Sequence, residues 1–296
     1  MHPLLSEIID AYPDLKYALL EAQTFDAGHF GFPELYYKIM ETDQVRINAF
    51  RRAFQHYNNF AGQVVCEVGV GRLALTKLFL PHVKKAYLIE SNPHLFDFLE
   101  AEIDQNGWQE RVVLFKADAL NIQLPEPVDY LIGENMSIYC ANELQVPLFQ
   151  HLRQFLRPGG KLIPEKIINL VQLGDTSFTP PRRHYPIFLT RHLPTLLTSQ
   201  ATVNTIDLYQ ATTEALTLTV EVEALLEGTI NCAFLHSWVQ CAPGANFTGT
   251  DSLMPPTVVQ LREPVTVKAG EHLRLTICYT YGTSLDEAVF FVTKSL

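Results

Sequence analysis

The chain has 296 residues, of which 47% are hydrophobic and 18% are charged, and its formal net charge is −10. This composition predicts an ordered globular protein, long enough for two lobes that each have a core. No run approaches the roughly 20 uninterrupted apolar residues of a membrane span, and the first residues lack the basic start of a secretory signal. The acidic balance argues against a nucleic-acid partner and suits a cationic one.

The five cysteines are odd in number and show no CxxC or Cys/His ligand spacing. Disulfide frameworks and metal sites have recognisable spacings of that kind. We therefore expect reduced thiols in a cytoplasmic protein, and no metal site.

In chain order, residues 4–22 and 34–57 are predicted to form amphipathic helices. From about residue 62, short apolar strands alternate with helices. The predicted strands are 64–68, 86–90, 112–116, 128–133 and 161–165, and the predicted helices are 72–80, 93–106 and about 143–156. Apolar strands separated by helices indicate a parallel sheet that is covered on both faces.

After about residue 166 the pattern changes to alternating, β-branched segments with turn residues between them. This predicts an all-β second lobe, either a barrel or a sandwich. The fold class is therefore α/β plus all-β. We expect N-terminal helices over residues 1–60, an α/β domain over 61–166 and a β-rich domain over 167–296.

A turn with two glycines follows the first predicted strand, where residues 65–72 read VCEVGVGR. Gly69 and Gly71 allow backbone angles that other residues resist, and they let a ligand come close to the main chain. Glu90 ends the next strand, 19 residues beyond Gly71, where a carboxylate can accept hydrogen bonds from both ribose hydroxyls. These features also fit a nicotinamide dinucleotide site.

Two acidic residues favour S-adenosylmethionine over the dinucleotide. Glu67 precedes the first glycine in an E-x-G-x-G pattern that is common in methyltransferases, and Asp118 follows the third strand, where it suits the adenine amine. Taken singly, the glycines could form a simple tight turn, and Glu90 and Asp118 could cap helices. Together, at the carboxyl ends of successive strands, they predict a cofactor site.

The fourth predicted strand runs directly into a segment that begins and ends with a glutamate, Glu134 and Glu143. A guanidinium is planar and permanently charged, and two facing carboxylates can hold it through paired, charge-assisted hydrogen bonds. One glutamate, or a water molecule beside it, could accept the proton after methyl transfer. Read alone, Glu143 could instead be an ordinary first-turn acid that follows an Asn142 cap.

On these motifs the chain resembles the protein arginine methyltransferase family over most of residues 29–290. The corresponding segment of that family is a hairpin with two glutamates at the same separation. Further matching segments are KIMETDQVR (38–46), VCEVGVG (65–71), YLIE (87–90), LRPGGKLIPEK (156–166) and PVTVKAGEHL (264–273).

The resemblance implies a Rossmann-like class I methyltransferase domain that follows N-terminal helices and precedes a β-barrel-like substrate domain. It implies that Arg46 pairs with the methionine carboxylate of S-adenosylmethionine, that Glu90 holds the ribose, and that Met40 packs beside the reacting methyl. Glu134 and Glu143 would bind the guanidinium. The product would be S-adenosylhomocysteine.

The chain departs from the family pattern at several points. Asn135 replaces the usual tryptophan after the first glutamate, and Arg72 stands where a small residue is usual. The Thr-His-Trp loop expected before VKAG reads SLM at residues 252–254, and His236, on an earlier strand, is expected to be structural. Residues 176–198 are shorter than the family's dimerisation arm, so we expect a weaker or different dimer, or a monomer.

The leading hypothesis is N-methylation of a guanidino group, carried by an arginine residue, a peptide or a small metabolite. Because the Thr-His-Trp loop is missing, O-methylation of a carboxylate or hydroxyl is an alternative, although two glutamates would repel an anionic acceptor. A catalytically silent cofactor-binding scaffold is a third reading. The retained pair of glutamates speaks against it.

Overall fold

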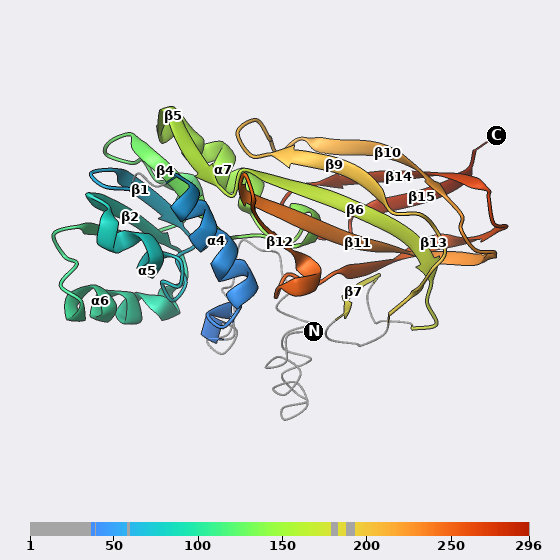
Figure 1. Cartoon of the computed structure of the whole chain (residues 1–296), viewed down its shortest axis with the longest axis horizontal. Helices are drawn as coiled ribbons and strands as arrows, with labels where there is room; N and C mark the ends of the chain where they lie inside the picture. The colour runs from blue at the N-terminus through green and yellow to red at the C-terminus, as the bar shows by residue number, and fades with distance from the viewer. Residues whose placement is uncertain (1–36, 39, 58–59, 179–182, 188–192, 296) are drawn as a thin grey trace.

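The computed structural model describes residues 37–38, 40–57, 60–178, 183–187 and 193–295, which form two lobes side by side along the long axis of the molecule (Figure 1). The predicted helix over residues 4–22 lies outside these ranges, as does the start of the helix predicted over 34–57. The predicted combination of a parallel α/β lobe and an antiparallel β lobe is confirmed.

The first lobe contains a five-stranded parallel sheet in the order β3-β2-β1-β4-β5. Every residue of the central strand β1 is buried, because the sheet is covered on both faces. The strands are β1 (Val64–Val68), β2 (Lys85–Glu90), β3 (Val112–Lys116), β4 (Val128–Gly133) and β5 (Leu156–Ile163).

The connections between these strands contain shorter helices than the sequence predicts. They are α5 (Thr76–Phe79), α6 (Phe96–Gln105) and α7 (Gln145–Leu152), with short 3-10 turns η1 (Leu80–His82), η2 (Pro93–Leu95), η3 (Ala119–Asn121) and η5 (Arg153–Phe155). The helix predicted over 72–80 is wrong at its start, because the glycine turn continues to Leu73, whose φ is +67°. A left-handed residue cannot continue a right-handed helix.

Helix α4 (Gln44–Tyr57) is the described part of the helix predicted over 34–57. Residues 37, 38 and 40 are also helical, but a turn at 41–42 separates them from α4. Asp43 causes the break: its Oδ1 accepts a hydrogen bond from the backbone N–H of Arg46 at 3.1 Å, as an N-cap residue does. The prediction of one continuous helix is therefore wrong.

The second lobe is built from two antiparallel sheets. The larger has the order β7-β13-β11-β6-β8, with β12 added to β11 and β9 added to β6, and the smaller has the order β10-β14-β15. These strand orders do not decide whether the two sheets close into a barrel, so the barrel stays a prediction. The strands are β6 (Lys166–Asp175), β7 (His184–Pro186), β8 (Thr195–Leu196), β9 (Ala201–Asp207), β10 (Ala215–Glu223), β11 (Gly228–Ala242), β12 (Ala245–Thr248), β13 (Thr257–Val267), β14 (His272–Thr280) and β15 (Val289–Lys294).

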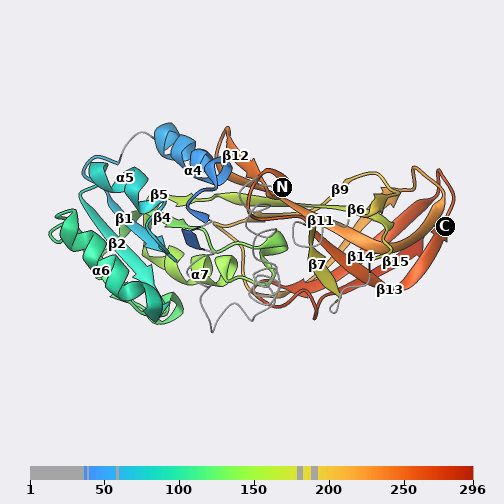
Figure 2. The same cartoon turned by 90° about the horizontal axis from the view of Figure 1, so that it is seen from below.

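Helix α4 lies between the two lobes (Figures 1 and 2). Toward the parallel sheet, the ring of Phe54 packs edge-on against Phe60 and Phe79, with ring centroids 5.3 and 5.8 Å away. Toward the antiparallel lobe, Phe50 packs on Phe247 of β12, at 6.4 Å. Helix α4 therefore packs against both lobes through neighbouring aromatic residues.

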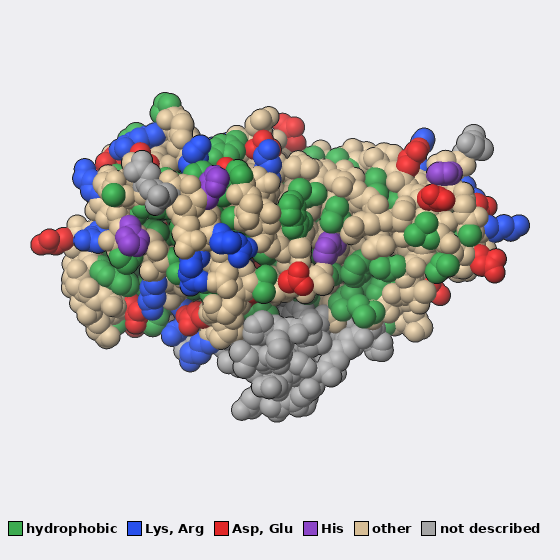
Figure 3. All heavy atoms as spheres, in the orientation of Figure 1, with side chains coloured by type: hydrophobic (Ala, Val, Ile, Leu, Met, Phe, Trp, Pro, Cys, Tyr) green, Lys and Arg blue, Asp and Glu red, His purple; other side chains and the backbone are tan. Residues whose placement is uncertain are grey.

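The surface of the described chain carries charges of both signs. On the face in Figure 3, Lys and Arg side chains are most frequent over the lobe with the parallel sheet, with acidic side chains among them. Among the described residues, no helix combines the length and the apolar character needed to cross a bilayer.

Replacing Phe54 with alanine should detach α4 from the parallel lobe. Phe54 is 7% exposed, and removing a buried aromatic ring leaves a cavity that costs about 3–5 kcal/mol. Urea unfolding should therefore show that loss. Phe291→Ala is the matched control, because Phe291 is 56% exposed and its removal should change stability by less than about 0.5 kcal/mol. Equal losses in the two variants would contradict the role given to α4.

Candidate active site

A cavity of about 520 Å³ opens at the carboxyl ends of the parallel strands, where the two lobes meet. This is the edge at which open α/β sheets bind ligands. All nine residues predicted for the site line this one cavity: Met40, Arg46, Glu67, Gly69, Gly71, Glu90, Asp118, Glu134 and Glu143.

The glycine turn between β1 and α5 uses both of its glycines. Gly69 and Gly71 have φ values of +69° and +53°, in the left-handed region that favours glycine. Gly69 also has no room for a side chain, because a Cβ there would lie 2.1 Å from Oδ1 of Asn135. The turn is held by Gly69 N–H, which donates to the carbonyl of Ile89 at 2.9 Å.

Glu90 ends β2 and is fixed by main-chain donors. Its Oε2 accepts from Gly71 N–H at 2.9 Å, and its Oε1 accepts from the N–H groups of Ser91 and Asn92 at 2.9 and 2.8 Å. Burial raises the pKa of Glu90, and these amide donors oppose the shift. The carboxylate is therefore oriented at the cavity wall before any ligand arrives.

The other two acids of the cofactor end have different surroundings. Glu67 is 2% exposed and accepts a short hydrogen bond from the Thr76 hydroxyl, and burial raises its pKa to about 8. Asp118 caps the turn η3 through the N–H of Leu120, at 2.9 Å. The capping role considered from the sequence is thus present at Asp118, on a residue that also lines the cavity.

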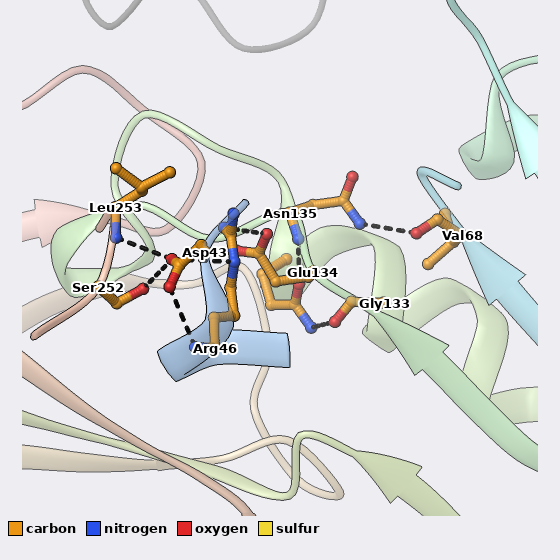
Figure 4. A network of polar contacts seen from close by, with 9 residues as sticks. Asp43, Arg46, Val68, Gly133, Glu134, Asn135, Ser252 and Leu253 are labelled. Atoms are coloured by element: carbon orange, nitrogen blue, oxygen red, sulfur yellow. Dashed lines mark hydrogen bonds and ion pairs between the residues drawn. The ribbon is translucent and has the colours of Figure 1, made fainter. Parts of the chain in front are cut away.

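Arg46, in the first turn of α4, joins the cofactor end to the predicted substrate end (Figure 4). Its Nη1 forms a close ion pair with Oε2 of Glu134, and its Nε lies 3.5 Å from Oδ2 of Asp43. Asp43 also accepts hydrogen bonds from the Ser252 hydroxyl and from Leu253 N–H, at 2.5 and 2.9 Å. The SLM loop at 252–254 therefore holds the acid that orients Arg46.

Asn135 and Gln145 hold the start of the two-glutamate segment, and Figure 4 shows the Asn135 side chain directed toward Val68. The Asn135 amide donates to the carbonyl of Val68 at 3.0 Å. Its backbone N–H donates to Gln145 Oε1 at 2.8 Å, and its carbonyl accepts from Gln145 N–H at 3.1 Å. The amide at position 135 thus connects the glycine turn with the residue after Glu134.

Glu143 precedes α7 and does not belong to its first turn, since α7 begins at Gln145. The side chain of Asn142 accepts a hydrogen bond from Leu285 N–H at 3.1 Å, so it does not cap α7. The simple first-turn reading of Glu143 therefore does not describe this segment. Burial, followed by repulsion from Glu134, raises the pKa of Glu143 to about 8, and Arg46 opposes the shift.

Two residues that support or line the cavity, Asp43 and His184, were not singled out from the sequence. The pairing of Asp43 with Arg46 could have been predicted from the sequence, because the two residues stand about one helical turn apart. His184, on β7, had only its place in the proline- and arginine-rich stretch 180–194 as a signal. Its Nδ1 lies 2.9 Å from Oδ1 of Asp286, which is 102 residues away along the chain. His236, expected to be structural, hydrogen-bonds Thr250 at 3.0 Å and does not line this cavity.

Glu143→Gln should stabilise the protein without ligands at alkaline pH. The folded-state pKa of about 8 lies above the usual 4.5, so protonation favours the folded state, and this contribution is lost as pH rises through about 8. At pH 9 the variant should exceed the wild type by about 1–3 kcal/mol, and the difference should shrink toward pH 5. Urea titrations at both pH values, with exposed Glu110→Gln as control, test this. A stability gain that is equal at both pH values would contradict it.

Comparison with known proteins adds sequence relatives. A protein-family sequence model described as PRMT5 arginine-N-methyltransferase matches residues 32–163 of this chain. An uncharacterized protein of Methanocaldococcus jannaschii is 28% identical over 149 residues, covering 50% of this chain and 56% of that protein. Histone-arginine methyltransferase CARMER of Anopheles gambiae is 28% identical over 131 residues, covering 43% of this chain and 21% of its own length. The chain thus spans about half of the first relative and about a fifth of the second.

Solved structures share the fold across both lobes. Arabidopsis thaliana protein arginine methyltransferase 10 aligns with a TM-score of 0.67 at 15% identity, covering 88% of this chain and 99% of that one. The Trypanosoma brucei PRMT1 enzyme-prozyme complex with AdoHcy aligns with a TM-score of 0.65 at 14% identity, covering 91% and 99%. The chain is therefore similar in sequence to arginine methyltransferases over residues 32–163, and it shares the fold of two solved arginine methyltransferase structures.

Proposed function

We propose that this protein is an S-adenosylmethionine-dependent methyltransferase that methylates a guanidino nitrogen. The acceptor is an arginine residue, a peptide or a small guanidino metabolite, held by Glu134 and Glu143. The observation that carries the proposal is the convergence of these two glutamates on the cavity that also contains the glycine turn and Glu90.

The residues at the cofactor end fit S-adenosylmethionine. Glycines at 69 and 71 remove side chains where the ligand approaches the main chain, and the oriented Glu90 carboxylate still has lone pairs for ribose hydroxyls. Asp118 suits the adenine amine, and Arg46 the methionine carboxylate. When bound, this cofactor supplies a methyl group that is already activated on a positively charged sulfur.

At the acceptor end, the two glutamates bind and orient the guanidinium. Carboxylates on both sides draw positive charge toward the nitrogens that they contact, which leaves the target nitrogen with more lone-pair character. The chain's largest contribution is then to hold this nitrogen in line with the methyl group, beside Met40. Glu143, or a water molecule beside it, takes the proton that the methylated nitrogen releases.

The same proposal assigns a separate binding role to each part of the chain. Residues 61–166 would bind the cofactor, 167–296 would bind the acceptor, and 1–60 would cover the cofactor site. We also infer a cytoplasmic location, supported by five cysteines that are all free. Protein substrates enter the proposal because the CARMER relatives are named as histone-arginine methyltransferases.

Glu134→Gln should reduce methyl transfer to guanidino acceptors by about 10²–10⁴-fold, because one of the two charges that orient the acceptor is lost. Calorimetry should show that S-adenosylhomocysteine still binds, because Glu90 keeps its bond to the glycine turn and Arg46 keeps its contact with Asp43. Mass spectrometry should place the wild-type methyl on a guanidino nitrogen, using arginine peptides, free arginine and lysine- or carboxylate-only counterparts.

Glu126→Gln is the control, because Glu126 bonds Lys85 and Tyr87 and does not line the cavity. It should retain wild-type turnover. Full activity in Glu134→Gln, or methyl found on oxygen, would sink the proposal. An oxygen-linked product would favour the O-methyltransferase alternative.

The pH profile should follow the ionisation of Glu143. Its pKa of about 8 leaves the residue mostly protonated at pH 6.5, where it cannot pair with a cation. The guanidinium stays charged throughout this range. We therefore expect kcat/KM for the acceptor to rise about tenfold per pH unit below pH 8 and to level off above it. A flat profile between pH 6.5 and 9 would show that Glu143 does not need to ionise.

A further inference from the structure

The segment between the two glutamates contains a sharp backbone reversal. Turn η4 (Ile138–Cys140) has two successive left-handed residues, Tyr139 with φ +64° and Cys140 with φ +49°. Neither is glycine, so this conformation persists only where the surroundings hold it in place. Both residues are completely buried, and the reversal lies three residues before Glu143.

A buried chain of polar side chains from the second lobe holds this reversal. Ser237 of β11 accepts a hydrogen bond from Tyr139 N–H at 3.1 Å and donates to Oδ1 of Asn169 at 2.8 Å. The Asn169 amide donates to Oδ1 of Asn204 at 2.9 Å, and the Asn204 amide donates to the Tyr281 hydroxyl at 3.1 Å. Ser237 and Asn169 are both 0% exposed.

The loop that follows β14 fixes the remaining residues before Glu143. Gly282 N–H donates to the carbonyl of Cys140 at 2.9 Å, and Leu285 N–H donates to the side chain of Asn142 at 3.1 Å. From β6, the carbonyl of Leu170 accepts from the Tyr139 hydroxyl at 2.9 Å. The approach to Glu143 is therefore set by the second lobe, whereas Glu134 is held by Arg46 and its segment by Gln145 in the first part of the chain.

We propose that Ser237 and Asn169 are positioning residues for Glu143. Through the N–H of Tyr139 they fix the reversal that aims the Glu143 carboxylate at the acceptor. This inference rests on the proposed function. It adds that the second lobe controls the geometry of the acceptor-binding glutamate, and that the chain Ser237–Asn169–Asn204–Tyr281 carries this control.

The test replaces Ser237 with alanine. The Tyr139 N–H is then left buried without its partner, and the reversal should relax. We expect kcat/KM for the guanidino acceptor to fall about 10- to 100-fold, because small displacements of positioning groups have effects of that size. S-adenosylhomocysteine affinity should stay within about threefold. In a double-mutant cycle, kcat/KM of the double variant Ser237→Ala with Asn169→Ala should fall by much less than the product of the two single fold-losses in kcat/KM.

A matched control separates positioning from stability. Thr198, in the connection between β8 and β9, is 1% exposed and accepts a hydrogen bond from Leu173 N–H of β6 at 2.8 Å. It is therefore a buried hydroxyl of the same lobe, and within the described part of the chain it makes no hydrogen bond with the reversal. Thr198→Ala should lower the melting temperature as Ser237→Ala does, while leaving kcat/KM unchanged. Tyr281→Phe is the milder second variant, because it removes only the last hydroxyl of the hydrogen-bonded chain. Its kcat/KM should fall about two- to fivefold.

Hydrogen exchange gives a readout that does not depend on turnover. The Tyr139 amide should exchange at least about tenfold faster in Ser237→Ala than in Thr198→Ala. If the wild type methylates no guanidino acceptor, the proposed function fails, and exchange at Tyr139 still decides whether Ser237 holds the reversal. Unchanged exchange, or equal kcat/KM in Ser237→Ala and Thr198→Ala, would overturn the inference.

Discussion

The arrangement of the cavity depends on a guanidinium, Arg46, that is shared by the carboxylates of Asp43 and Glu134. Buried charges are tolerated only when they are paired and hydrogen-bonded. Arg46 satisfies this condition for two acids from different parts of the chain, and its field also lowers the cost of ionising Glu143. The position of the first turn of α4 therefore determines how much negative charge the cavity can hold.

That dependence explains why α4 is fastened on both sides. Phe54 anchors it to the parallel lobe, and Phe50 anchors it to β12. The Ser252 hydroxyl and Leu253 N–H reach Asp43 from the loop after η6 (Gly249–Asp251). The loop that reads SLM at 252–254 thus supports Asp43 through a hydroxyl and a main-chain amide. Asn135, in place of the usual tryptophan, fills the space above Gly69.

Much of the first lobe could be predicted from the sequence, because its strands are buried on both faces and its glycine turn is a local signal. The predicted helix boundaries were wrong where a specific local conformation or hydrogen bond overrides the apolar periodicity. Asp43 interrupts a continuous apolar periodicity with a cap, and Leu73 extends the glycine turn into the expected helix. The supports of the two-glutamate segment could not be predicted. Asn169, Asn204 and Ser237 lie on strands whose alternation indicates burial but does not name a partner.

The reversal at Tyr139 and Cys140 has a consequence for how such a protein can change over evolution. The segment that carries Glu143 belongs to the first lobe, but its backbone is bonded by the second lobe. We therefore expect the two lobes to evolve together. Exchanging the C-terminal sheets for an unrelated domain would remove the bonds that keep those two residues left-handed. New acceptors are therefore expected to be acquired through substitutions at the cavity wall that leave these bonds intact, and not through the exchange of whole domains.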